Sequence, residues 1–184
     1  MSKTDFDAFV KRQQSEQQKE ESFDPKQQLE QWLGYLDALY EQMRGYLQTY
    51  IESGAAQIEY RDIPLNEEFI GAYTARKMLL NIGRSTVTFT PIGTMLIGTK
   101  GRVDVQGPIA SARLSLVNKQ VTTARQLVQV TIRRPGDPPP ARPSLEAIKQ
   151  IEWVWKISTP PPEMKFIELT QETFFEMILA VANA

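Results

Sequence analysis

The strongest constraint on the fold is a change in hydrophobic period near residue 55. From Pro25 to Ser53, apolar residues recur every three or four positions, which is the spacing of one face of an α-helix. Asp24 is a good N-cap, proline is favoured at the first helical position, and Gly54 is typical just after a helix end. The sequence therefore predicts one long amphipathic helix over residues 25–53. Its apolar residues are Leu29, Trp32, Leu33, Leu36, Leu39, Tyr40, Met43, Tyr46, Leu47, Tyr50 and Ile51.

From Ala56 onward, apolar residues alternate with polar ones, as they do along β-strands that have one buried face. The segments are short, glycine-rich turns separate them, and no crossover helix fits between them before residue 118. We therefore expect an antiparallel meander of about six to eight strands within residues 56–157. The predicted strands are Gln57–Ile63, Ala75–Ile82, Ser85–Thr90, Thr94–Gly98, Arg102–Gln106, Ala112–Val117, Leu127–Arg133 and Ile151–Ile157.

Two helices are expected to cover one face of this sheet, which gives an α+β fold. Thr170 is the N-cap of the second helix, over residues 170–182. The apolar seam of the long helix either packs on its own sheet or pairs with a second chain. The seam is wide and includes Trp32 and Tyr40, which favours packing on the sheet. The apolar stripe of the C-terminal helix comprises Phe174, Phe175, Ile178, Leu179 and Val181.

The chain divides into a polar arm and a single domain. Residues 1–23 are rich in Gln and Glu, which predicts a flexible arm or a frayed helix. Residues 24–184 form the α+β domain, from which a proline-rich loop over residues 135–143 is expected to project. The few apolar residues of the arm include Phe6 and Phe9, which are candidates for binding a partner or a second copy of the chain.

Histidine and cysteine are both absent from the 184 residues. Their absence excludes disulfides, cysteine nucleophiles, thiolate or imidazole zinc sites and Ser-His-Asp triads. No apolar run reaches the roughly 20 residues of a membrane span, and the first residues do not resemble a signal peptide. The sequence predicts a cytoplasmic protein that does not enter a membrane, and it indicates no cofactor.

Charge is strongly segregated along the chain, although the formal net charge is only −1. Residues 1–70 carry 7 basic and 14 acidic groups, and residues 143–184 carry 3 basic and 6 acidic groups. Residues 71–142 carry 11 basic groups and only two acids, Asp104 and Asp137. The basic middle therefore either binds an acidic partner or is covered by the acidic helices of the same chain.

Strand alternation places polar and basic side chains on one face of the expected sheet. Lys100, Arg102, Arg113 and Arg133 are the candidates for binding an anion or a nucleic-acid backbone there. No aromatic residue is predicted to point outward on this face, which disfavours base stacking and hence single-strand binding. The other outward residues are Thr86, Thr88, Thr90, Asp104, Gln106, Ser115, Gln129 and Thr131.

Three further patterns have a structural interpretation as well as a chemical one. Residues 97–102 contain two glycines beside Lys and Arg, but the spacing is not that of a P-loop, so a hairpin turn is favoured. Trp153 and Trp155 are expected to be core anchors, with a ligand-facing shelf as the alternative. Carboxylates that could hold a metal or act as acid or base are favoured to be solvated or ion-paired instead. These carboxylates are Asp62, Glu67, Glu68 and Asp104.

The composition favours a protein that is not an enzyme, because no catalytic motif is present. The first hypothesis is an interaction or regulatory protein that binds a protein partner or itself through the long helix, with Trp32 and Tyr40 beside Phe6 and Phe9 as contact residues. The second is an anion or nucleic-acid binder that uses the basic face. The third is an enzyme that uses carboxylates and a hard metal. The sequence assigns no catalytic residue and no metal ligand.

Overall fold

The long helix α2, Pro25–Glu52, forms as the sequence predicts and ends one residue earlier. In this computed structural model, residues 24–94, 99–127 and 151–183 are described. The side chain of Asp24 caps the helix by accepting hydrogen bonds from the backbone N–H groups of Lys26 and Gln27, at 3.0 and 3.3 Å. After the helix, Gly54 takes a φ of +76°, a conformation that glycine adopts at little cost.

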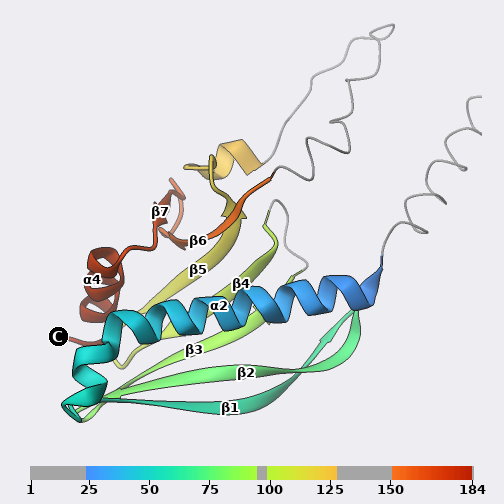
Figure 1. The fold of residues 1–184 in the computed structure, drawn as a ribbon. Coiled ribbons are helices and arrows are strands. Elements are labelled where there is room, and N and C mark those ends of the chain that lie inside the picture. Colours follow the sequence, from blue (N-terminus) through green and yellow to red (C-terminus); the bar gives the residue numbers. More distant parts are fainter. Residues whose placement is uncertain (1–23, 95–98, 128–150, 184) are drawn as a thin grey trace, which may run out of the picture.

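The sheet has seven strands in the order β1-β2-β3-β4-β5-β6-β7, and every neighbouring pair is antiparallel (Figure 1). This confirms the predicted α+β meander. The strands are β1 (Ala56–Glu67), β2 (Gly71–Ile82), β3 (Ser85–Gly93), β4 (Gly101–Gln106), β5 (Ser111–Asn118), β6 (Trp153–Ser158) and β7 (Phe166–Glu168).

Some predicted strands differ from the observed ones. Strand β7 was not predicted, and Leu127 ends the short 3-10 helix η1, Ala124–Leu127, instead of starting a strand. Thr94 is in a bend beyond β3. The rest of these two predicted strands, at 95–98 and 128–133, lies outside the described residues, as do the proline-rich loop 135–143 and the arm 1–23.

Both helices pack on the same face of the sheet, which we call the inner face. Helix α4, Gln171–Ala182, lies beside α2 and faces β3 and β5 (Figure 1). The seam of α2 packs on its own sheet, as the width of its apolar stripe favours. The fully buried side chains that join the layers include Trp32, Leu36, Leu39, Tyr40 and Met43 from α2, Met78, Leu80, Val87, Phe89, Leu114 and Leu116 from the sheet, and Phe174 from α4.

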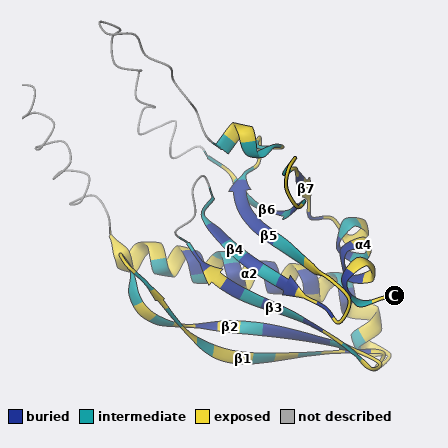
Figure 2. Cartoon of the chain, turned by 180° about the vertical axis from the view of Figure 1, so that it is seen from behind, coloured by how far each residue is buried: buried dark blue, intermediate teal, exposed yellow. Residues whose placement is uncertain are grey.

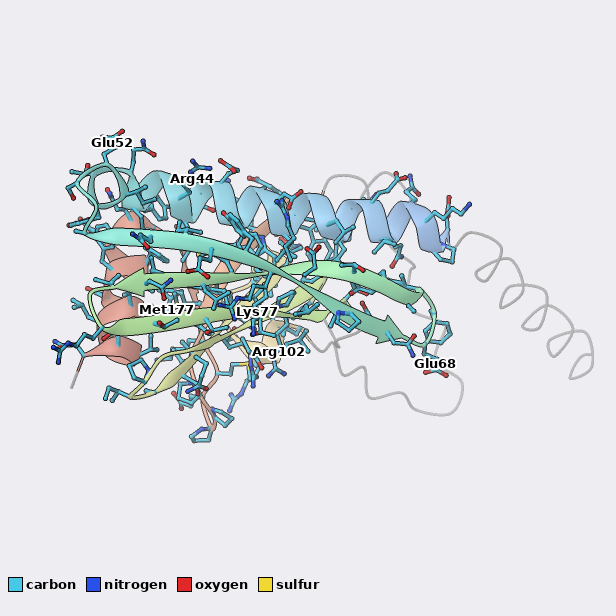
Figure 3. The ribbon with its side chains drawn as sticks, turned by 90° about the horizontal axis from the view of Figure 1, so that it is seen from below. Arg44, Glu52, Glu68, Lys77, Arg102 and Met177 are labelled. Carbon is cyan, nitrogen blue, oxygen red and sulfur yellow. The ribbon has the colours of Figure 1, made fainter. Side chains whose placement is uncertain are left out.

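The β1–β2 hairpin twists strongly in the part that extends past its pairing with β3. Near its base Met78 is buried, whereas nearer its tip Ala75 is buried, although these two residues point to opposite faces of β2. Figure 3 shows the two strands crossing on the way to Glu68. The tip is fastened by Glu67, whose carboxylate accepts hydrogen bonds from the hydroxyl of Tyr73 and from the backbone and side chain of Thr94.

Helix α4 is held at both ends. Thr170 caps it as predicted, in a reciprocal box with Thr173. At the other end, the carbonyl oxygen of Val181 accepts hydrogen bonds from the backbone N–H groups of Ile109 and Ala110 in the β4–β5 turn, at 3.0 and 3.3 Å. These bonds bring the helix end against Gly107, where a Cβ would lie 2.2 Å from the Val181 oxygen. The turn therefore fixes where α4 ends.

A chain segment covers one end of the opposite face, which we call the outer face. Lys156 of β6 is only 6% exposed, and its ammonium donates to the carbonyl oxygens of Lys119 and Val121 at 2.7 and 2.8 Å. Phe166 is joined to the same segment by a bond from its backbone N–H to the carbonyl oxygen of Thr122. Neither helix covers the rest of the outer face, as the view from behind shows (Figure 2).

Two tyrosines make the folded state sensitive to alkaline pH. The hydroxyl of Tyr40 donates to the carbonyl oxygen of Arg76 at 2.6 Å, and burial raises the pKa of Tyr40 well above 10.0. Burial also raises the pKa of Tyr73, and its hydrogen bond to Glu67 adds to the effect. Both phenols lose their proton near pH 10 when the chain is unfolded, but they keep it in the folded protein.

We therefore expect the free energy of unfolding to fall as the pH rises above about 10, because only the unfolded state releases these protons. For Tyr40 the loss is up to about 1.4 kcal/mol per pH unit. Urea denaturation at a series of pH values measures it. Tyr40→Phe should remove about half of the slope and leave the part that Tyr73 contributes, whereas Tyr50→Phe, at a position 49% exposed, should retain all of it. A free energy of unfolding that does not change above pH 10 would contradict this expectation.

Candidate functional site

The uncovered part of the outer face is mostly polar. Its side chains come from alternate positions of β2, β3, β4 and β5, as the sequence pattern predicts. Arg102 points to the side of the sheet away from α2 (Figure 3). None of the described outward residues on these strands is aromatic, so the face has no platform on which a base could stack. The described polar residues at these positions are Lys77, Asn81, Thr86, Thr88, Thr90, Arg102, Asp104, Gln106 and Arg113, and the apolar Leu79 and Ile92 alternate with them, 8% and 41% exposed.

Two arginines share one carboxylate at the centre of this face. Arg102 donates from Nε and Nη2 to the two oxygens of Asp104, at 2.6 and 2.7 Å. Arg113, which lies opposite Asp104 in the β4–β5 register, approaches the same carboxylate only to 3.8 Å. The group therefore carries one more positive charge than negative charge.

A hollow of about 370 Å³ opens beside these three residues. Its floor is formed by β4 and β5, and one wall is the connector that follows β6. We call it the Arg102–Arg113 hollow. It is lined by Arg102, Asp104, Val105, Gln106, Ser111, Ala112, Arg113, Ser158, Thr159, Pro160 and Pro161.

Lys100, a third residue predicted to bind an anion, does not lie beside Arg102 and Arg113. Lys100 lies before β4 begins, and its side chain reaches the inner face, where its ammonium donates to Gln31 Oε1 at 3.0 Å. The same ammonium lies 5.7 Å from the ring centroid of Tyr35 and 5.3 Å from that of Trp153, and burial lowers the pKa of Lys100. Arg133 lies outside the described residues. The structure thus brings together two of the four.

Trp32 and Tyr40, two of the residues predicted to bind a partner, do not lie on an open surface. Trp32 and Tyr40 are each 1% exposed, because they face the sheet from α2. Trp155 is buried as predicted, with its ring centroid 6.0 Å from that of Trp32 and its Nε1 donating to the carbonyl oxygen of Tyr35. Phe6 and Phe9 lie outside the described residues.

The carboxylates considered for metal binding or catalysis have structural roles or are dispersed. Glu67 fastens the hairpin tip and Asp104 is ion-paired, while Asp62 and Glu68 are exposed. Within residues 24–94, 99–127 and 151–183, no three acidic residues are grouped as metal ligands would be. The strand that begins at Gly101 agrees with a hairpin turn at residues 97–102 and not with a P-loop, which opens a helix.

A second surface feature was not predicted. At one end of the molecule, a hollow of about 330 Å³ lies between the last turns of α2, the α2–β1 connection, the end of β2 and helix α4. We call it the α2–α4 groove. Tyr50, Ile82 and Leu179 are 49%, 37% and 58% exposed at its margin, and the Tyr50 ring meets Phe175 edge-on at 5.9 Å. The groove is lined by Leu47, Tyr50, Ala55, Ala56, Ile82, Phe175, Ile178 and Leu179.

No protein-family model, curated protein or solved structure matches this chain. Neither helix of the described residues has the length and hydropathy that crossing a membrane requires.

Proposed function

We propose that this chain is a non-catalytic interaction protein and that its α2–α4 groove binds a second copy of the chain. The observation that supports this most directly is the concentration of exposed apolar side chains at one end of the molecule. Tyr50, Ile82 and Leu179 surround a hollow whose other walls are also apolar. A contiguous exposed apolar patch is costly in water and commonly marks an interaction site.

The chemistry of the groove favours a polypeptide over a small ligand. Small-molecule sites combine apolar walls with a few placed polar groups that orient the ligand. The described residues that line this groove offer one side-chain polar group, the hydroxyl of Tyr50. Apolar side chains from another protein surface need no such orientation, because their burial is favourable in any orientation that fills the hollow.

A second copy of the chain suits the groove because the same surface has both an apolar hollow and an apolar side chain that could fill one. An apolar hollow and a projecting Leu179, which is 58% exposed, lie next to each other on the same surface. Two-fold symmetry places the projection of each copy against the hollow of the other.

The proposal is tested by measuring the molar mass of the full chain by analytical ultracentrifugation over a wide range of concentrations. We expect a concentration-dependent dimer. Leu179→Glu should give a monomer with an unchanged circular dichroism spectrum, because the side chain is exposed and its replacement leaves the core intact. Ile167→Glu is the matched control: Ile167 of β7 is 42% exposed and lies outside the groove lining, so this variant should still dimerise.

A chain that starts at Ser22 separates the groove from the N-terminal arm, which contains Phe6 and Phe9. If the groove is the contact, this shorter chain dimerises as the full chain does. A full chain that is monomeric at every concentration would overturn the proposal, as would equal dissociation by Leu179→Glu and Ile167→Glu.

A further inference from the structure

We infer that the Arg102–Arg113 hollow on the outer face binds a small ligand through one carboxylate or phosphate group. The inference does not depend on self-association, because the hollow and the α2–α4 groove share no lining residue. Three observations carry it: an uncompensated positive charge, hydrogen-bond donors without partners, and a preformed space beside them.

The positive charge of Arg113 is not neutralised, because Asp104 is already paired with Arg102. Both carboxylate oxygens accept from Arg102, at 2.6 and 2.7 Å, which is the bidentate geometry of a strong arginine–carboxylate pair. Arg113 Nε lies 3.8 Å from Asp104 Oδ1, beyond hydrogen-bonding distance. Among the described residues, no other acidic side chain lines the hollow. An incoming oxyanion would therefore supply the second negative charge that the two guanidinium groups lack.

The donors are available because the side chain of Arg113 makes no hydrogen bond within the described residues. Its Nε is buried and unpaired, and leaving a charged donor desolvated and unbonded is costly. By contrast, other polar side chains around the hollow are occupied: Ser158 bonds to Ser115 at 2.8 Å, and Thr159 donates to the carbonyl oxygen of Glu163 at 3.1 Å. Arg113 is thus the residue expected to bind the anion directly.

The space is preformed and its position is fixed by the sheet. Arg113 lies opposite Asp104 on one side and opposite Ser158 on the other, so two strand registers hold its backbone. The hollow has a volume of about 370 Å³, which is within the roughly 300–1,000 Å³ of small-molecule sites. Pro160 and Pro161 form a stiff wall, which limits the reorganisation that binding would require.

A small ligand fits these observations better than a nucleic acid does. Polyanion binding needs several separated cations along a track, and one excess charge in a single hollow does not provide them. The absence of outward aromatic residues among the described strand positions also removes the stacking that single-strand binders use.

The test is a titration of the full chain with inorganic phosphate and, separately, with acetate, at constant ionic strength and followed by the Nε–H signals of the arginines in ¹⁵N NMR spectra. We expect the Arg113 signal to shift saturably with at least one of the two anions. Saturation by phosphate alone identifies a phosphate site, and saturation by acetate alone identifies a carboxylate site.

Two substitutions with opposite expected effects sharpen the test. Arg113→Gln, followed by the Nε–H signal of Arg102, should weaken binding about tenfold or more, because it removes the charge-assisted donors. Asp104→Asn should strengthen binding several-fold, because it removes the one negative charge in the hollow. The matched control is Arg61→Gln, which changes an exposed arginine that is paired with Glu59 at 3.3 Å and does not line the hollow.

The inference is overturned if neither anion gives a saturable shift at Arg113 up to high millimolar concentration. It is also overturned if Arg61→Gln weakens binding as much as Arg113→Gln does, since that result would indicate general charge screening. If the Asp104→Asn variant binds the anion more weakly while its melting temperature is unchanged, the negative charge of Asp104 does not oppose anion binding, and the inference is overturned.

Discussion

Replacing Gly101 with alanine is expected to lower the free energy of unfolding by about 3 kcal/mol, the upper end of the usual cost of overpacking a core. Gly101 is the first residue of β4, and the Trp32 ring lies directly on it. A Cβ at this position would lie 2.1 Å from Trp32 Cζ3 and 2.6 Å from Trp32 Cε3. The ring has little room to move away, because Trp32 is 1% exposed and also contacts Trp155.

Gly45 provides the matched control, since it lies in α2 and an added Cβ there would meet nothing within 4 Å. Gly45→Ala is expected to raise the free energy of unfolding by roughly 0.5–1 kcal/mol, because alanine is the better helix former. Urea denaturation followed by far-ultraviolet circular dichroism measures both variants. If Gly101→Ala is as stable as the unchanged chain, Trp32 does not pack on β4 as described.

Replacing Phe174 with alanine is the second change with a large expected effect, a loss of about 3–5 kcal/mol. Phe174 is fully buried at the point where both helices meet the sheet. Its ring centroid lies 5.7 Å from that of Tyr46 in α2 and 6.5 Å from that of Phe89 in β3. Removing the ring leaves a cavity that the rigid sheet cannot close.

Leu179→Ala, measured at concentrations at which the chain is monomeric, serves as the control because Leu179 is on the same helix but 58% exposed. It should change the free energy of unfolding by less than about 0.5 kcal/mol. Thermal and urea denaturation of the two variants compare them directly. Equal destabilisation by both would show that α4 does not pack through Phe174, and it would also remove the reason for treating Leu179 as a surface residue.

The fold was largely predictable because periodicity reports which face of an element is buried. The spacing of apolar residues gave α2 to within one residue, and the caps at Asp24 and Thr170 gave the helix starts. Strand β7 was missed because Phe166–Glu168 is too short to show alternation. The last part of β1 was missed because proline disfavours a strand interior, but Pro64 is tolerated in an edge strand.

The candidate sites were only partly predictable, since they depend on contacts between distant segments. Alternation placed Arg102 and Arg113 on one face correctly, but it does not apply to Lys100, which lies before the strand begins and reaches the inner face. The α2–α4 groove joins segments of α2, β2 and α4 that are far apart in the sequence. The one sign of the groove in the sequence was Leu179, an apolar residue at the flank of the α4 stripe, where a polar residue is usual.

The long edge of β1 bears on how copies of the chain can meet. An exposed strand edge offers unpaired backbone groups to another strand, and this is a common route to aggregation and fibre growth. Along the 12 residues of β1, Pro64 has no N–H to donate, and the strong twist of the hairpin prevents a second flat strand from following the edge. The β1 edge is therefore a poor template for pairing with another strand, so copies of the chain would meet through an end surface and not through β1.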